Sequence, residues 1–257
     1  MTQSLHPSAQ KGFSLAAERY QQARPHYPEN ITYWLKNHLQ LTPNHIILDL
    51  GSGTGKFLPY LQQITSHIIA IEPISAMLEQ LKISYPHIQT QQAYSHQLPF
   101  SNEFADAITC AQSFHWFAQP ETLTELYRVL KPNAQLILIW NQRDIDIAWV
   151  KQLDDVLQTL ESDTPRYHSH QWKKVFEQQT QFKPIAETTF SLSHHGTVEQ
   201  VVLQRLLSTS FIAALPHAEQ NKLKQQFADI VYTHTGKTAQ DEIDFPYTTH
   251  VYAFQKI

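Results

Sequence analysis

The sequence predicts an α/β protein with a doubly wound, mostly parallel sheet, and three observations support this prediction. Short, β-branched apolar runs alternate with segments of helical period through the first half of the chain. Several of these runs are apolar without interruption, as strands covered on both faces are. A glycine-rich turn lies where the first run passes into the first helical segment. Strand, helix and strand repeated in this order predict parallel strands joined by crossover helices.

The elements of the first half follow from this periodicity. The predicted strands are HIILDL (45–50), HIIAIE (67–72), HIQTQQ (87–92), ADAITCA (105–111) and QLILIW (135–140). Between them, apolar side chains recur at helical spacing, which predicts helices that bury one face. These stripes are formed by Phe57, Leu58, Leu61 and Ile64, by Met77, Leu78 and Leu81, and by Leu123, Leu126, Tyr127 and Leu130, the last one stopping at KPNA.

The flanking parts of the chain are predicted to be mainly helical. A helix around Ile31, Trp34 and Leu35 follows the proline-containing approach RPHYPEN. Beyond residue 140 the predicted elements are a helix at about 147–160, a strand near 188–192, a helix opened by a capping box of Thr197 and Gln200, a helix at 223–231 and a strand at 248–256.

Composition narrows the class of protein. With 42% hydrophobic and 16% charged residues, the 257-residue chain is typical of a globular protein, and no segment approaches the ~20 apolar residues of a membrane span. The first residues lack the features of a secretory signal, and a single cysteine excludes an internal disulfide, so we expect a cytoplasmic protein. A net charge of −4 without a basic run argues against nucleic acid or membrane partners. The histidines show no clustered ligand spacing, so we expect no metal site.

The stretch IILDLGSGTGKF holds three of the six glycines in the chain, at Gly51, Gly53 and Gly55. Their spacing differs from that of a P-loop, because Leu50 stands where the first glycine is required. It also departs from the dinucleotide fingerprint G-x-G-x-x-G, because Lys56 occupies the third glycine position. A nicotinamide-dependent oxidoreductase is therefore disfavoured, and the turn suits a ligand that presents no phosphate.

Two carboxylates flank this turn. Asp49 precedes the glycines and could bind a cationic amine. Glu72, at the end of the second predicted strand, has the usual place of a carboxylate that binds ribose hydroxyls. An amino acid joined to a nucleoside fits both groups, which predicts S-adenosylmethionine as the ligand. The alternatives are that Asp49 only caps the following helix and that Glu72 is a solvated strand end.

At these residues the sequence resembles the class I, Rossmann-like S-adenosylmethionine-dependent methyltransferases. LDLGSGTGKF (48–57) is similar to their first motif and AIEPISAML (70–78) to their second. SHQLPFSNEFADAITCAQSFHWF (95–117) resembles the block from the adenine contact to the end of strand four, and LYRVLKPNAQLILI (126–139) resembles the helix and fifth strand that follow. The resemblance implies a mostly parallel, seven-stranded sheet with an antiparallel last strand, an N-terminal helical segment and a C-terminal helical insertion.

On this basis we expect three regions and an enzyme. The regions are an N-terminal helical lid at 1–40, a Rossmann-like cofactor-binding core at 41–143, and a helical insertion with the last strands at 144–257 that completes the same domain. The expected activity is transfer of a methyl group from S-adenosyl-L-methionine. The alternative is a protein that binds this cofactor without catalysis, as a sensor or as a silent partner of another chain.

Shorter motifs outside the core resemble the small-molecule methyltransferases related to trans-aconitate methyltransferase. They are ERYQQARPHYP (18–28), AQSFHWF (111–117), WNQRD (140–144) and LLSTSFIAALP (206–216). This resemblance implies a small-molecule acceptor enclosed by the N-terminal segment and the helical insertion, with a carboxylate oxygen as one candidate for the methylated atom. We expect the protein to be a monomer or a homodimer.

The resemblance also implies roles for individual residues. The expected cofactor-binding residues are Asp49, Gly51, Ser52, Gly53, Gly55, Glu72, Pro73, Met77, Ser95, His96, Gln112 and Tyr27. His96 departs from the acidic residue that often stands at its position. The expected substrate pocket consists of Tyr20, Arg24, His115, Trp116 and Arg143.

These acceptor-side roles have structural alternatives. His115 is the first candidate for a general base because of the ordinary pKa of histidine, although a carboxylate acceptor would need no base. His115 and Trp116 could instead pack under the insertion. Tyr20, Arg24 and Tyr27 could tether a helix by aromatic packing, and Arg143 could pair with Asp144.

Overall fold

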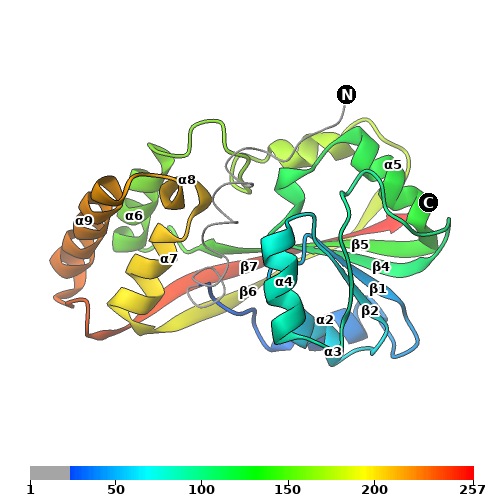
Figure 1. Cartoon of the computed structure of the whole chain (residues 1–257), viewed down its shortest axis with the longest axis horizontal. Helices are drawn as coiled ribbons and strands as arrows, with labels where there is room; N and C mark the ends of the chain where they lie inside the picture. Colours follow the sequence, from blue (N-terminus) through cyan, green and yellow to red (C-terminus); the bar gives the residue numbers. More distant parts are fainter. Residues whose placement is uncertain (1–23) are drawn as a thin grey trace. The chain divides into compact units, whose positions relative to one another are not determined.

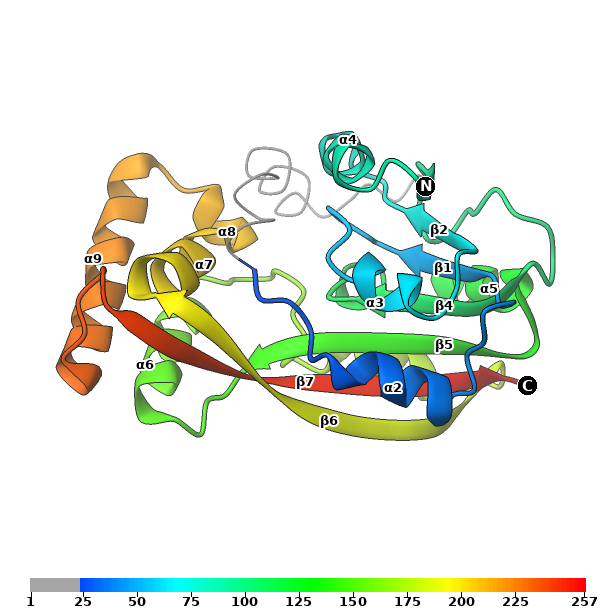
Figure 2. The ribbon, with the colours of Figure 1, turned by 90° about the horizontal axis from the view of Figure 1, so that it is seen from below.

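The computed structural model describes residues 24–257, and within this range the chain forms a seven-stranded sheet in the order β3-β2-β1-β4-β5-β7-β6 (Figure 1). The strands are β1 (Ile47–Leu50), β2 (Ile68–Ile71), β3 (Gln89–Gln91), β4 (Ala105–Ala111), β5 (Leu130–Arg143), β6 (Phe182–Thr197) and β7 (Glu242–Lys256). The strands β1 to β5 pair in parallel, whereas β7 runs in the opposite direction to β5 (Figure 2). The predicted fold class is therefore confirmed.

Helices precede, connect and follow these strands. The α-helices are α2 (Asn30–Asn37), α3 (Leu58–Gln62), α4 (Ser75–Ser84), α5 (Pro120–Val129), α6 (Ala148–Gln158), α7 (Gln204–Leu207), α8 (Ser210–Ala213) and α9 (His217–Thr235). Short turns of tighter or wider helix are η1 (Phe114–Trp116), η2 (Gln171–Phe176) and η3 (Val198–Leu203). The capping box of Thr197 and Gln200 is present, although it opens the π-helical turn η3, which continues into α7.

Burial explains why the first strands are continuously apolar. Successive side chains of a strand point to opposite faces, so both faces of a covered strand must be apolar. On one face, Leu48 and Leu50 lie in a core with side chains of α5 and η2. On the other face, Ile47 lies in a second core with side chains of α2 and α3. The two layers of helix are what the doubly wound pattern predicts.

Three strands are longer than the sequence predicts, and one of them is β7, which begins at Glu242 and not near residue 248. β5 begins at Leu130 and includes the segment KPNA, where Asn133 adopts a left-handed φ of 65°. β6 extends from Phe182 to Thr197 with alternating half-buried and exposed residues, and it lies at the edge of the sheet. The side chains of this edge strand are largely polar, so its hydrophobic pattern is weak. For this reason the sequence predicts only the centre of β6.

The described chain divides into two compact units that interleave along the sequence. One consists of Tyr27–Trp140, Pro165–Phe190 and Thr249–Ile257, and it holds both cores described above. The other consists of 24–26, Asn141–Thr164 and Ser191–Thr248, with a third core formed by α6, η3, α7, α9 and the first half of β7. The predicted boundaries at residues 40 and 143 stay a prediction. From residue 24 to 257, the chain has no helix with the length and apolar character that a membrane span needs.

Candidate functional site

The glycine turn links the end of β1 to α3 and is fixed to the end of β2. Gly51, Gly53 and Gly55 have φ angles of 70°, 57° and 88°, the left-handed region that strains other residues. The N–H groups of Gly51 and Ser52 both donate to the carbonyl of Ile71, at 2.8 and 3.0 Å. The turn is therefore formed by the protein itself and does not depend on a ligand for its shape.

The glycines differ in what a side chain would meet. A Cβ atom added to Gly51 would lie 2.6 Å from Cβ of Ser113, and one added to Gly55 would lie 2.7 Å from the ring of Tyr85. A Cβ atom on Gly53 would meet nothing closer than the sulfur of Met77, at 3.8 Å. Gly51 and Gly55 thus allow close packing within the protein, whereas Gly53 leaves space for a ligand against bare backbone.

Asp49 contributes a buried carboxyl group at the end of β1, with 1% of its surface exposed. The hydroxyl of Thr109 on β4 donates to Oδ1 at 2.7 Å. Burial raises the pKa of Asp49 to about 6, although this hydrogen bond favours the ionised form. The second oxygen, Oδ2, is buried without a hydrogen-bond partner. Leaving such an acceptor unsatisfied is unfavourable, so the site is suited to receive a donor such as an ammonium group.

Glu72 follows β2 and is oriented by two backbone amides. The N–H of Gly53 donates to Oε2 at 2.9 Å, and the N–H of Ile74 donates to Oε1 at 3.0 Å. Burial raises the pKa of Glu72 to about 7, and the negative charge of Asp49 adds to the shift. Each carboxylate oxygen can accept more than one hydrogen bond, so Glu72 keeps the capacity to accept from hydroxyl groups.

The end of β4 is joined to the glycine turn through Ser113, whose hydroxyl donates to the carbonyl of Leu50 at 2.7 Å. The preceding residue, Gln112, has a left-handed φ of 60°, and its N–H donates to the carbonyl of Ile139 at 2.8 Å. A positive φ in a residue with a Cβ costs roughly 1–2 kcal/mol, and such strain is concentrated at functional sites. The expected contact of Gln112 with the cofactor stays a prediction.

The expected adenine-side residues form a neighbouring group. Ser95 is buried, and its hydroxyl lies 3.0 Å from that of Thr122 on α5. The ring of His96 stacks on Tyr94, with 5.8 Å between centroids. The carbonyl of Pro73 accepts a hydrogen bond from Gln92 at 3.0 Å. The cofactor roles of Ser95, His96 and Pro73 stay predictions.

His115 and Trp116 lie on η1, directly after β4. The indole Nε1 of Trp140, on β5, donates to Nδ1 of His115 at 3.0 Å. The ring of Trp116 is tilted against His115 at 5.1 Å between centroids. The sequence does not predict this hydrogen bond between Trp140 and His115, because the two residues are separated by 25 positions in the chain.

The remaining predicted residues have other partners. The N–H of Tyr27 donates to the hydroxyl of Tyr60 at 2.9 Å, and that hydroxyl donates back to the carbonyl of Tyr27 at 2.6 Å, which fixes the entry into α2 against α3. Arg143 donates through Nε to Oδ1 of Asp154 on α6 at 3.1 Å, so its acidic partner is Asp154 and not Asp144. Arg24 is half-buried, and Tyr20 lies outside the described residues.

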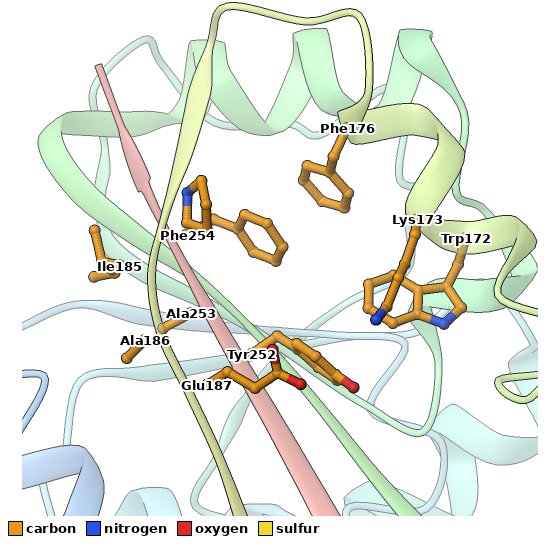
Figure 3. A pocket seen from close by; sticks show the side chains of 10 residues that line it. Trp172, Lys173, Phe176, Ile185, Ala186, Glu187, Tyr252, Ala253 and Phe254 are labelled. Carbon is orange, nitrogen blue, oxygen red and sulfur yellow. The ribbon is translucent and has the colours of Figure 1, made fainter.

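A separate hollow of about 370 Å³ is lined by residues of η2, β6 and β7 (Figure 3). Its walls include Trp172, Phe176 and Tyr252, and the ammonium of Lys173 lies 5.0 Å from the centre of the Tyr252 ring. It contains none of the residues predicted from the sequence. Among residues 24–257, no three His, Cys, Asp or Glu side chains come together as a metal site would require.

Comparison with known proteins gives consistent results. Residues 48–138 match the methyltransferase domain family. An uncharacterized methyltransferase-like protein of Schizosaccharomyces pombe is 35% identical over 250 residues, which is 96% of each chain. An uncharacterized methyltransferase of Mycobacterium tuberculosis is 28% identical over 206 residues, which is 76% of this chain and 83% of that protein. The structure of a proposed type II methyltransferase from Anaeromyxobacter dehalogenans has the same fold, with a TM-score of 0.67 at 21% identity over 91% of this chain and 97% of that chain.

Proposed function

The chain belongs to the class I S-adenosylmethionine-dependent methyltransferases, and from this premise we propose that it methylates a small molecule, with a carboxylate oxygen as the acceptor. This choice of acceptor is supported by the resemblance of AQSFHWF, WNQRD and LLSTSFIAALP to the group related to trans-aconitate methyltransferase. It is also consistent with a net charge of −4, which disfavours a nucleic acid as substrate.

One observation carries the proposed cofactor site: the buried, unpartnered Oδ2 of Asp49 lies at the same turn as the open backbone of Gly53 and the oriented carboxylate of Glu72. We assign the ammonium group of the cofactor to Asp49 and its ribose hydroxyls to Glu72. Gly53 and Met77 would form the wall against which the ligand lies. These residues fit an amino acid joined to a nucleoside, because they offer acceptors for both ends and no cationic group for a pyrophosphate.

The contribution of the chain to the reaction follows from these contacts. The bound cofactor supplies an electrophilic methyl group with a good leaving group. The protein must then align the acceptor with the methyl carbon and exclude water. In well-oriented reactions, alignment alone raises the rate as much as an effective reactant concentration of about 10⁵ to 10⁸ M would. Buried carboxyl groups and backbone held by hydrogen bonds provide the rigid positioning that such alignment requires.

We do not expect Arg143 to bind the acceptor. Its guanidinium already forms hydrogen bonds to Asp154, and both side chains are about nine-tenths buried. An acceptor carboxylate at Arg143 would have to compete with this pair. We therefore expect Arg143 to stabilise the position of α6 through Asp154 in the middle of this helix, and the acceptor to be bound mainly by residues after β4.

The test has two arms. Calorimetric titration should give S-adenosylmethionine binding in the wild-type protein and a loss of at least tenfold in affinity in Asp49→Asn, which keeps the shape of the side chain and removes its charge. Unchanged affinity would reject the site. Incubation with a metabolite extract and small polycarboxylates, read by mass spectrometry, should then give methyl esters. Methylation confined to amines or to macromolecules would reject the proposed acceptor.

A further inference from the structure

The hollow lined by η2, β6 and β7 lies apart from the proposed cofactor site (Figure 3). In the order of the sheet, β7 and β6 are the third and fourth strands from β1, which carries the glycine turn. At ~4.8 Å between neighbouring strands, this places them roughly 14–19 Å from β1. The volume of about 370 Å³ is at the lower end of the range of ligand pockets. The hollow therefore has room for a small molecule of its own.

Most of the wall of this hollow is apolar. The rings of Phe176 and Phe254 stack at 4.2 Å between centroids, and Ile185 adds an aliphatic side chain that is 39% exposed. Trp172 and Tyr252 meet edge to face at 5.1 Å, and both are buried. Because these rings are held by the core, they offer a fixed apolar surface to an apolar group of a ligand.

Two charged side chains adjoin the ring of Tyr252 in the same hollow (Figure 3). The ammonium of Lys173 lies 5.0 Å from the centre of this ring, and Lys173 forms no ion pair with a described residue. Burial raises the pKa of Tyr252, and hydrogen bonds to Tyr167 and Glu187 raise it further, so its hydroxyl stays protonated and can donate to Glu187. Within residues 24–257, Glu187 also forms no ion pair. The hollow thus presents one cationic and one anionic group.

These two charges disfavour a ligand of a single sign. A simple cation would be repelled by the ammonium of Lys173, and a simple anion by the carboxylate of Glu187. A zwitterion offers an opposite charge to each. Because both groups adjoin one tyrosine ring, the two charges of the ligand must also be close together. An α-amino acid meets this condition, since its ammonium and carboxylate are attached to the same carbon.

We propose that this hollow binds a free α-amino acid with an apolar side chain, with its carboxylate at Lys173 and its ammonium at Glu187. The side chain of the ligand lies against the stacked rings of Phe176 and Phe254. This site is additional to the cofactor site and does not depend on the proposed methyl transfer. Lys173 and Glu187 are both exposed, so each ion pair contributes modestly, and the expected affinity is in the millimolar range.

The first test compares three related ligands on the full chain. L-phenylalanine carries both charges, 3-phenylpropionate lacks the ammonium, and phenethylamine lacks the carboxylate. In calorimetric titrations, phenylalanine should bind more tightly than either analogue by about 2- to 5-fold, which is the value of one exposed ion pair. An analogue that binds as tightly as phenylalanine would overturn the inference, because the hollow would then take a simple anion or cation. Absence of phenylalanine binding would overturn it as well.

The second test removes each charge in turn. Lys173→Met keeps the apolar stem of the side chain, and Glu187→Gln keeps its shape. Each variant should weaken phenylalanine binding by about 2- to 5-fold. Lys173→Met should not weaken the binding of phenethylamine, and Glu187→Gln should not weaken that of 3-phenylpropionate. Lys174→Met is the matched control, because Lys174 is an exposed neighbour that does not line the hollow, and it should bind phenylalanine as the wild type does. Wild-type affinity in both Lys173→Met and Glu187→Gln would overturn the inference.

A last control separates the two proposed sites. Phenylalanine shares its amino-acid end with S-adenosylmethionine, so it could enter the cofactor site at Asp49. Asp49→Asn should therefore leave phenylalanine affinity unchanged while it weakens cofactor binding. Loss of phenylalanine binding in this variant would assign the ligand to the glycine turn and overturn the inference. Phenylalanine binding at the hollow in a protein that does not bind S-adenosylmethionine would reject the cofactor site and support the inference.

Discussion

Asp49 and Glu72 are two buried carboxyl groups that interact, since the charge of Asp49 contributes to the raised pKa of Glu72. Burial is the main cause of both shifts, to about 6 for the pKa of Asp49 and about 7 for that of Glu72. Hydrogen bonds from Thr109, Gly53 and Ile74 only partly compensate. The site therefore titrates near neutrality, where ordinary carboxyl groups are fully ionised.

The first prediction concerns stability in the absence of cofactor. Because the folded pKa of Glu72 is raised from 4.5 to about 7, the folded state holds a proton that the unfolded state releases over this interval. The contribution of Glu72 to stability is thus greatest below pH ~4.5 and falls by about 3 kcal/mol as pH rises to ~7, at about 1.4 kcal/mol per pKa unit. Urea unfolding at several pH values measures this. The slope should be smaller in Glu72→Gln, and equal slopes would contradict the assignment.

The second prediction is that cofactor affinity changes with pH in the opposite direction. An ammonium at Asp49 and hydroxyls at Glu72 both favour ionised carboxylates, so binding should expel protons and strengthen as pH rises through about 6 to 7. Calorimetric titrations in buffers of different ionisation enthalpy count the released protons. Binding without proton release at pH 6 would rule out these contacts.

The third prediction separates the roles of two glycines. Gly53→Ala places a methyl group in open space at a φ of 57°, so we expect a loss of roughly 1–2 kcal/mol in stability and a larger loss of cofactor affinity. Gly51→Ala has similar backbone strain but would also force Cβ to within 2.6 Å of Ser113, so it should destabilise the fold much more. Thermal midpoints and titrations of both variants provide the comparison. If Gly53→Ala bound the cofactor normally, Gly53 would not line the site.

The fourth prediction concerns the ion pair between Arg143 and Asp154, whose side chains are 8% and 10% exposed. Removing one partner of a buried pair leaves an uncompensated charge and costs about 3–5 kcal/mol. Asp154→Leu should therefore destabilise the protein strongly, and the double variant Arg143→Met with Asp154→Leu should recover much of the loss. Denaturant unfolding measures both. A double variant as unstable as the single one would show that Arg143 has another essential role.

Secondary structure could be predicted from the sequence where burial requires a hydrophobic pattern. Strand β1 could be predicted because both of its faces are covered, and the turn after it because glycine is so rare elsewhere in the chain. Edge strand β6 was found only in part, since its exposed, polar residues carry little periodicity. Residues 131–134 were expected to end a helix, but pairing with β4 brings the beginning of β5 into the sheet.

The partners of site residues were harder to predict than the residues themselves. Asp49 was recognised by its position before the glycines, whereas its partner Thr109 looked like an ordinary strand residue. One signal was available, because Thr109 is a polar side chain inside an otherwise apolar part of ADAITCA. The pairing of Trp140 with His115 had no such signal, because it depends on the neighbouring positions of β4 and β5 in the sheet.

The interleaving of the two units determines how the chain can be divided. Strands β5, β6 and β7 each begin in one unit and end in the other, so the polypeptide crosses between them repeatedly. A fragment that stops at Trp140 would lack β6 and β7 and would leave β5 as an open edge, which is a hazard for aggregation. Neither unit is therefore a portable module, and grafting a new acceptor specificity onto this scaffold will require exchange of side chains within the intact chain.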